Sequence, residues 1–417
     1  MLKAILIDCI KPSITAEEAA YRLDEAENLI KTYGGVVLVK KIQKRLIPTY
    51  KTFIGSGKIE ELINIGNTLS ANILIINNEL KPTQTYNLSE IFRPHGIAVW
   101  DRIDLILKIF QKHAATREAR LEIELAAIKH MGPRIFGMGM QLSRQGGGIG
   151  TKGVGETNIE FMKRHLAKLE FRILKELAEC KRVRKLHRAS RRRQRFKTVG
   201  IIGYTNAGKS SLLNALTKKG AYVADKLFAT LDTRVGKMFL KADQYPAETG
   251  HSAKNRDTIP TYSPITNKPN SNPPLKTPPQ SKVAPQLKAT PPPLEILISD
   301  TIGFIQDLPP TLIKSFRSTL EETVEADILL HVIDIADPKM DRKIKVVNEI
   351  LGQIDSFRKP CIYVFNKTDL LPQKIMDPIK KNLRKIYNNF TPCFVSTYNG
   401  DGLATLKQEI SRRLLIS

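Results

Sequence analysis

The sequence has few cysteines, few aromatic residues and no long apolar run. Its four cysteines (Cys9, Cys180, Cys361 and Cys393) are far apart and form no C-x-x-C pair, and its seven histidines form no H-E-x-x-H pair. These spacings argue against a disulfide framework and against a zinc site. Apolar stretches such as Asp327–Ile333 are far shorter than the ~20 residues of a membrane helix. We therefore expect no metal ligation by Cys or His and no stable membrane insertion.

The first residues, M-L-K-A-I-L-I-D-C-I, contain only a short apolar run with an early Asp. A secretory signal peptide needs a longer apolar region and a small-residue cleavage site, and both are absent here. The segment therefore predicts a β-strand, and we expect a cytoplasmic protein.

Positive charge is abundant. The formal net charge is +25 and the pI is about 9.8, values typical of proteins with a polyanionic partner. The partner could be nucleic acid or an anionic membrane surface, and the latter would mean peripheral association. Residues 111–197 hold 22 Lys/Arg and 8 Asp/Glu, a net charge of +14 in one segment. This concentration favours a specific partner over a generally basic surface.

A chain of 417 residues is too long for one typical core and predicts two or three domains. Residues 1–112 alternate short apolar runs with amphipathic stretches, which predicts a small parallel α/β domain. The expected strands are Ala4–Ile7, Val36–Val39, Ile73–Ile76 and Ile97–Trp100, and the expected helices are Thr15–Tyr33, Lys58–Leu69 and Thr83–Phe92. Thr15 and Glu18 have the spacing of a capping box.

Residues 113–197 predict a basic helical hairpin with a glycine-rich loop. Apolar residues recur every three or four positions from Leu121 to Ile128, in a run expected to end near Gly132–Pro133, and again from Ile159 to Cys180. This seam favours packing within one chain over a dimerising coiled coil, so we expect a monomer. The second helix continues into residues 181–197, where ten of seventeen residues are Lys or Arg. Contact with a phosphate backbone explains this density.

Residues 198–417 predict a second α/β domain interrupted by a proline-rich segment. Residues 241–293 hold twelve of the chain's 24 prolines and few apolar clusters, which predicts a disordered insertion. The insertion separates two expected strands, Arg234–Leu240 and Leu294–Ser299. Extra length at a hairpin tip costs little, because loop-closure entropy grows only logarithmically with length.

The strongest motif in this second domain is G-x-x-x-x-G-K-S at Gly203–Ser210. It follows an apolar strand and opens an apolar-periodic helix, the context that a phosphate-binding P-loop requires. Main-chain N–H groups at the helix N-terminus can bind phosphates. Lys209 can reach the β- and γ-phosphates, and the hydroxyl of Ser210 can ligate Mg²⁺.

Three further motifs follow in the order of a guanine-nucleotide site. Asp300 to Gly303 is D-x-x-G, in which the Asp can hold Mg²⁺ through water and the Gly amide can sense the γ-phosphate. Residues 366–369 are N-K-x-D, and the Asp369 carboxylate can accept hydrogen bonds from N1–H and N2 of guanine. Adenine lacks this donor pair, and such a mismatch rejects analogues strongly. Ser396 is expected to close the base pocket.

The water-positioning residue and the switch threonine are less clearly marked. Many GTPases have a Gln after D-x-x-G, whereas this chain has Phe304, so hydrolysis is expected to be slow and stimulated by a partner. Thr230 is the preferred switch threonine, with Thr233 as the rival. We expect Lys209, Thr230 and Gly303 to serve catalysis, and Ser210, Thr230 and Asp300 to hold Mg²⁺. The residues expected to contact GTP are Gly203, Tyr204, Thr205, Asn206, Ala207, Gly208, Lys209, Ser210, Ser211, Phe228, Ala229, Thr230, Leu231, Asp232, Asp300, Thr301, Ile302, Gly303, Asn366, Lys367, Thr368, Asp369, Ser396 and Thr397.

Apart from the insertion, the chain resembles the HflX family of bacterial ribosome-associated GTPases. The motifs that carry the resemblance are F-I-G-S-G-K-I-E-E-L (53–62), D-R-I-D-L-I-L-K-I-F (101–110), L-S-R-Q-G-G-G-I-G-T-K-G-V-G-E-T (142–157), G-Y-T-N-A-G-K-S-S (203–211), L-F-A-T-L-D (227–232) and D-T-I-G-F-I (300–305). The resemblance implies an N-terminal α/β domain with a helical hairpin, binding to the large (50S) ribosomal subunit and its rRNA, and splitting or rescue of stalled ribosomes.

The chain departs from the family at several points. T-R follows L-F-A-T-L-D directly, where the family has Pro and an extra Thr before Arg, and K-G-V-G-E replaces R-G-P-G-E. The first departure leaves the switch geometry open. Asn206 resembles the P-loop Asn with which related GTPases use K⁺, and K⁺ stimulation is a hypothesis here.

Two other matches to nucleotide motifs are weaker. G-S-G-K at 55–58 lacks the leading Gly and the following Ser/Thr, and predicts a turn into a helix. G-x-G-x-x-G at Gly148–Gly153 follows no apolar strand, which a dinucleotide site needs, so an oxidoreductase is disfavoured. We instead expect this loop, with Arg144 and Lys152, to probe RNA. Two alternatives stay open: a GTPase of ribosome assembly or another RNA target, and an RNA-binding module timed by weak GTP hydrolysis.

Overall fold

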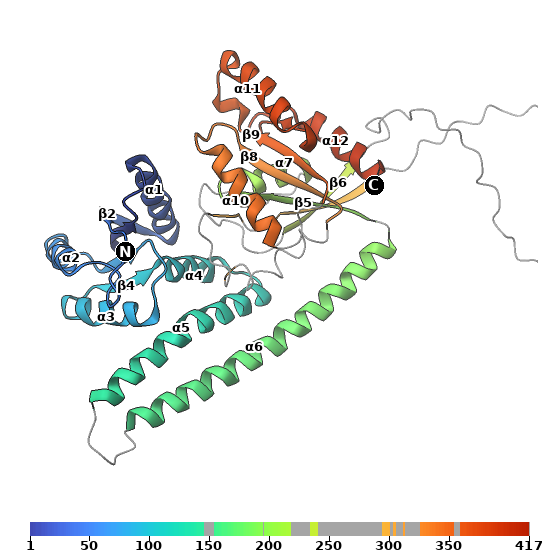
Figure 1. Ribbon diagram of the computed structural model, residues 1–417. Helices are drawn as coiled ribbons and strands as arrows, with labels where there is room; N and C mark the ends of the chain where they lie inside the picture. The colour runs from blue at the N-terminus through green and yellow to red at the C-terminus, as the bar shows by residue number, and fades with distance from the viewer. Residues whose placement is uncertain are drawn as a thin grey trace, which may run out of the picture.

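The structure, a computed structural model, describes residues 1–145, 154–194, 196–217, 234–240, 294–300, 303–305, 312, 326–353 and 359–416. Figure 1 shows two α/β regions and a long helical hairpin that extends away from both. The predicted disordered insertion, 241–293, lies outside the described residues.

The N-terminal sheet has four parallel strands in the order β2-β1-β3-β4. The strands are β1 (Leu2–Ile10), β2 (Gly35–Lys44), β3 (Ile73–Ile76) and β4 (Ala98–Asp101). β1 and β3 are almost entirely apolar because helices cover them on both faces. All four strands predicted from the apolar runs are confirmed, and β1 and β2 are longer than expected.

Helices cover both faces of this sheet. α1 (Ala16–Tyr33) and α4 (Arg102–His113) pack on one face, and α2 (Ser56–Leu69) and α3 (Pro82–Phe92) pack on the other; the short 3-10 helix η1 (Arg93–His95) follows α3. The hydroxyl of Thr15 caps α1 by accepting the Glu18 N–H at 3.2 Å. The predicted return bond of a capping box is absent from the described bonds of α1, because the Glu18 carboxylate pairs with Arg342 instead.

The hairpin consists of α5 (Arg117–Gln145) and α6 (Val154–Arg193). Leu121, Leu125 and Ile173 are buried in its seam, so the predicted packing within one chain is confirmed. The predicted helix end at Gly132–Pro133 is wrong, since α5 continues to Gln145. A proline removes one hydrogen bond from a helix without ending it where the helix lies along a partner. Among the described helices, none is both long and apolar enough to cross a membrane.

The C-terminal sheet has six strands in the order β10-β9-β8-β5-β7-β6. Of the strands that the structure describes here, β6 alone is antiparallel, so the predicted mixed sheet is confirmed. The strands are β5 (Lys197–Gly203), β6 (Arg234–Leu240), β7 (Leu294–Asp300), β8 (Ile328–Asp334), β9 (Cys361–Asn366) and β10 (Cys393–Phe394). The central strands are buried, as a sheet covered on both faces requires.

Among the residues that the structure describes, helices cover both faces of this sheet. α7 (Lys209–Thr217) and α12 (Leu403–Ile416) share one apolar core with the sheet. α10 (Met340–Gln353) and α11 (Gln373–Ile386) pack on the other face. The 3-10 helices η3 (Thr368–Leu370) and η4 (Asn388–Phe390) flank α11. The carboxyl ends of β5, β7 and β9 therefore meet at one edge, where the predicted nucleotide motifs begin.

Candidate functional site

The loop between β5 and α7 wraps tightly at its two glycines. Gly203 has φ +152° and Gly208 has φ +91°. A Cβ on Gly203 would lie 2.3 Å from the Val332 carbonyl oxygen, and one on Gly208 would lie 2.2 Å from Nδ2 of Asn366. Any other residue would therefore push the loop away from β8 and β9. The loop leads directly into the N-terminus of α7, which favours anions.

Lys209 is buried at the start of α7. Its Nζ donates to the Tyr204 carbonyl at 2.8 Å, so the ammonium lies inside the loop. Burial lowers the pKa of Lys209 to about 8, and the nearby Asp300 carboxylate partly offsets this shift. A bound phosphate would offset the burial of this cation in the same way. The lysine is thus placed to receive an anion.

Ser210 and Asp300, two of the three predicted metal ligands, are adjacent. The Ser210 hydroxyl donates to Oδ2 of Asp300 at 2.7 Å, and Asp300 is fully buried at the end of β7. A hydroxyl and a carboxylate are oxygen ligands of the kind that Mg²⁺ prefers. These residues therefore fit a magnesium ion. The third predicted ligand, Thr230, lies outside the described residues.

Gly303 lies against the same ammonium. A Cβ there would be 2.9 Å from Nζ of Lys209 and 2.7 Å from Cγ2 of Thr205, so only glycine allows this approach. Phe304 pairs with the loop through its main chain. Its N–H donates to the Gly203 carbonyl at 3.1 Å, and its carbonyl accepts from Thr205 N–H at 2.8 Å. The Phe304 ring is buried in an apolar cluster and cannot hold a water molecule.

The N-K-x-D segment is joined to the P-loop by a buried amide. Nδ2 of Asn366 donates to the Ala207 carbonyl at 3.0 Å, and Oδ1 of Asn366 accepts from Thr397 N–H at 3.2 Å. The Ser396 hydroxyl donates to the Asp369 carboxylate at 2.5 Å. Asp369 is exposed, and a base lying over it would cover it. Asn366, Asp369, Ser396 and Thr397 thus form one hydrogen-bonded group, called the base rim below.

Lys367 adopts φ +64°, the left-handed region, between Asn366 and η3. Its Nζ pairs with the Asp334 carboxylate at 2.7 Å, which fixes the long side chain beside the base rim. The structure therefore brings the predicted P-loop, D-x-x-G and N-K-x-D residues together. Seven predicted contact residues lie outside the described residues: Phe228, Ala229, Thr230, Leu231, Asp232, Thr301 and Ile302.

The side chain of Tyr204 points to the N-terminal domain. Its hydroxyl donates to the carboxylate of Glu25 in α1, and Nζ of Lys343 lies 4.8 Å from its ring centroid. Only its main chain therefore faces Lys209. Glu25 was not predicted from the sequence, because no local sequence pattern indicates a contact between residues 179 positions apart.

The segment after D-x-x-G also contacts the N-terminal domain. Ile305 and Leu312 are buried in the apolar core formed by β1, α1 and α4. Arg342 at the start of α10 pairs with Glu18 of α1, and Lys339 pairs with Glu17 at 3.3 Å. The two domains are thus joined at the nucleotide site.

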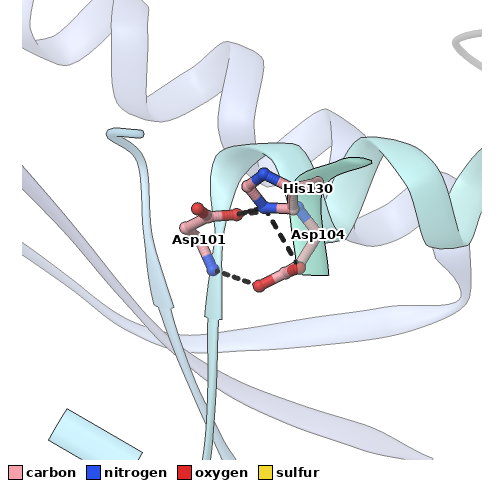
Figure 2. A group of neighbouring side chains, drawn as sticks. All are labelled: Asp101, Asp104 and His130. Carbon is pink, nitrogen blue, oxygen red and sulfur yellow. Dashed lines mark hydrogen bonds and ion pairs between the residues drawn. The ribbon is translucent and has the colours of Figure 1, made fainter. Parts of the chain in front are cut away.

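A second polar cluster lies in the N-terminal domain (Figure 2), where His130 of α5 meets Asp101 and Asp104 at 3.3 and 3.4 Å. The three ligand atoms lie within 4.8 Å of one another, a spacing that a metal ion could use. However, Oδ1 of Asp101 accepts the Asp104 N–H at 2.8 Å, and Oδ2 of Asp104 accepts the Asp101 N–H at 3.2 Å. The carboxylates therefore cap α4, and His130 fastens α5 to this cap.

A parallel sheet with a P-loop, a D-x-x-G glycine beside the lysine and an N-K-x-D base rim defines a P-loop GTPase. Family models match in the same order along the chain. "GTP-binding GTPase N-terminal" matches residues 20–111, "GTP-binding GTPase Middle Region" matches 113–191, and "50S ribosome-binding GTPase" matches 198–367.

Curated relatives named "GTPase HflX" match nearly the whole chain. That of Caldanaerobacter subterraneus is 38% identical over 96% of this chain and 79% of its own length. Those of Escherichia coli and Methanocaldococcus jannaschii are 32% and 34% identical, covering 94% and 92% of this chain and 79% and 81% of their own lengths. The chain belongs to the HflX family of GTPases, and it is a GTP-binding GTP hydrolase.

Proposed function

We propose that this GTPase binds the large ribosomal subunit through its N-terminal domain and basic hairpin, and that GTP drives the splitting or rescue of stalled ribosomes. The observation that carries the proposal is the solvent face of α6. The description of the matching GTPase model, "50S ribosome-binding GTPase", supports the same partner.

One exposed face of α6 combines cations with aromatic rings. The exposed residues at spacings of three and four along it are Phe161, Arg164, Lys168, Phe171 and Lys175. Within the part of the chain that the structure describes, Arg164, Lys168 and Lys175 make no ion pair. Unpaired cations at helical spacing can follow a phosphate backbone, and the two rings can contact sugars or bases.

In this proposal Lys209 and Gly303 contact the γ-phosphate, Ser210 and Asp300 hold Mg²⁺, and Asp369 with Ser396 selects guanine. The bound ion supplies charge stabilisation at the phosphates. Because Phe304 is buried, the attacking water needs another group to orient it. We infer that hydrolysis is slow alone and faster on the ribosome, with Thr230 closing over the site.

Asn206 supports a dependence on K⁺. It lies in the P-loop at φ +63°, and its side chain is exposed rather than packed into the fold. An exposed amide oxygen beside the phosphate site can ligate a monovalent cation. Equal hydrolysis in K⁺ and Na⁺, with large subunits present, would contradict this role.

The glycine-rich loop at the free end of the hairpin is assigned to RNA contact. Its residues 146–153 lie outside the described residues, whereas α5 and α6 place its two ends far from the nucleotide site (Figure 1). A helix, not an apolar strand, precedes it, so the dinucleotide motif lacks its required context. Deleting Gly146–Gly155 should spare GTP binding and weaken binding to large subunits.

The test of the proposal is sedimentation of the protein with isolated large subunits and with intact ribosomes. We expect co-sedimentation with the large subunit in a non-hydrolysable GTP analogue and release in GDP. We also expect the affinity to fall steeply with salt, because phosphate contacts release counterions. Absence of co-sedimentation with large subunits at low salt would refute the proposal, and binding to small subunits alone would point to another RNA target.

A further inference from the structure

The loop between β2 and α2, residues 45–53, exposes large apolar side chains. Leu46, Ile47 and Tyr50 are 74%, 75% and 80% exposed. In the described part of the chain these are three of the most exposed large apolar residues, and they lie within five positions. This loop lies outside the nucleotide site described above, because it follows β2 of the N-terminal sheet.

The 45–53 loop is nevertheless held in one conformation. Thr49 and Phe53 exchange two main-chain hydrogen bonds of 3.0 and 2.8 Å. From α3, the side-chain amides of Gln84 and Asn87 donate to the main-chain carbonyls of residues 49–51 at 2.9 to 3.2 Å. The side chain of Gln84 is buried, and its oxygen accepts the Lys81 N–H at 2.9 Å, so Gln84 ties the loop to the start of α3. An exposed tip that is already ordered loses little entropy when a partner covers it.

The sequence around the 45–53 loop is basic, although Lys31, Lys40, Lys41 and Lys58 pair with acids of α1 and α2. Between Glu27 and Glu60 the sequence has seven Lys/Arg and no Asp/Glu. Lys51 and Lys81 make no ion pair among the residues that the structure describes, and Nζ of Lys81 lies 6.0 Å from the ring centroid of Tyr50. A polyanion would therefore meet two cations without ion pairs, one next to Tyr50 in the chain and one over its exposed ring.

We propose that the 45–53 loop binds an unpaired nucleotide of large-subunit RNA. The Tyr50 ring stacks on the base, Leu46 and Ile47 contact the sugar and the base edge, and Lys51 and Lys81 bind the flanking phosphates. Proteins read unpaired RNA bases by stacking them on aromatic side chains beside cations. This inference rests on the proposed function and adds a second RNA contact outside the hairpin.

RNA fits this surface better than a lipid surface does. Three apolar side chains on one short loop bury too little area for stable membrane binding, which usually requires two anchoring signals. An RNA contact needs less apolar area, because the hairpin supplies a second attachment to the same polyanion. Two linked contacts raise the overall affinity well above that of either one.

The test compares Tyr50→Ala with Tyr50→Phe in the full-length protein, measuring affinity for isolated large subunits with a GTP analogue. We expect Tyr50→Ala to weaken binding about tenfold or more, and Tyr50→Phe to bind like wild type, because stacking needs the ring and not the hydroxyl. Phe239→Ala is the matched control: this ring is 59% exposed at the edge of the other sheet, and its loss should change nothing. GTP affinity should be the same in all three variants.

The double variant Lys51→Gln/Lys81→Gln tests the phosphate contacts. The slope of log K against log salt should fall by about 1.4 to 1.8, since each lost phosphate contact removes 0.7 to 0.9. If wild type binds subunits and Tyr50→Ala binds equally well, the loop inference is wrong and the proposed function stands. If the wild-type protein does not bind large subunits at all, both the loop inference and the proposed function are wrong. Loss of binding to phosphatidylglycerol vesicles, with subunit binding unchanged, would assign the loop to a membrane instead.

Discussion

The N-terminal domain has a parallel sheet and the GTPase domain a mixed one, but both place helices on the two faces of the sheet and gather polar residues where strands end. In the N-terminal domain these residues neutralise one another. Arg22 pairs with Asp8 at 2.8 Å, Nδ2 of Asn77 donates to Asp8 at 3.0 Å, and Arg102 binds Glu25 at 2.7 Å.

The corresponding edge of the GTPase domain is left open to an anion. Glycines at 203, 208 and 303 remove side-chain bulk, and Lys209 brings a buried cation whose nearest partner is a main-chain carbonyl. The comparison teaches that the sheet does not decide the chemistry. What decides it is whether the charged side chains after the strands pair directly with one another or leave room for an anion beside a buried cation.

The largest expected effect tests the base rim. Asp369→Asn replaces an acceptor of two hydrogen bonds, so preference for GTP over xanthosine triphosphate should change by about 10⁴-fold in favour of the latter. Competition binding with both nucleotides measures this change. Unchanged GTP affinity would mean that Asp369 does not contact the base.

The next effect compares the P-loop lysine with the lysine of G-S-G-K at 55–58. Lys209→Ala should weaken GTP binding about 100-fold or more, because charge-assisted contacts with two phosphates are lost. Lys58→Ala, in G-S-G-K at the start of α2, should leave GTP affinity unchanged, since Lys58 pairs with Glu61. Titration with a fluorescent GTP analogue measures both. An equal loss in Lys58→Ala would place a second nucleotide site in the N-terminal sheet.

A third effect tests the paired charges at the strand ends of the N-terminal sheet. Arg102→Met leaves the Glu25 carboxylate buried without its cation and should destabilise the N-terminal domain by about 3 kcal/mol. Trp100 is the only tryptophan and lies in β4 beside Arg102, so its fluorescence during urea unfolding reports this domain. The exposed pair Arg93–Glu90 of the same domain is the control, and Arg93→Ala should cost less than about 1 kcal/mol. Equal costs would show that burial of the Arg102 pair does not matter.

The smallest effect concerns magnesium. Ser210→Ala should weaken GTP binding about tenfold with Mg²⁺ present and hardly at all after chelation, since one ligand to the ion is lost. Ser299→Ala, which removes a buried hydroxyl directly before Asp300, should show no such dependence. An equal loss with and without Mg²⁺ would assign Ser210 a role in packing alone.

Sequence alone predicted most of the two sheets and the core of the nucleotide site. Buried parallel strands are continuous apolar runs, and nucleotide motifs have fixed local spacing after such strands. Prediction failed where distant contacts outweigh local preference. Pro133 did not end α5, because α6 packs along it, and Glu18 paired with Arg342 rather than closing its own capping box.

The contact between the two domains could not be predicted from the sequence either. Glu25 sits among helix-forming residues like any solvent-facing acid, and only the fold brings it to the Tyr204 hydroxyl. Ile305 and Leu312 read as ordinary apolar residues of the GTPase domain, although they lie in the core of the other domain. Local patterns carry no information on which core an apolar residue joins.

α6 is a single helix from the glycine-rich loop to within four residues of β5, the strand that carries the P-loop (Figure 1). At 1.5 Å per residue its 40 residues span about 60 Å. The residue count of the helix therefore fixes how far its first residue lies from the strand that carries the P-loop. It also fixes direction, since one inserted residue would turn everything beyond it by about 100°. An insertion or deletion in α6 therefore changes both the length of the helix and the direction in which its far end faces.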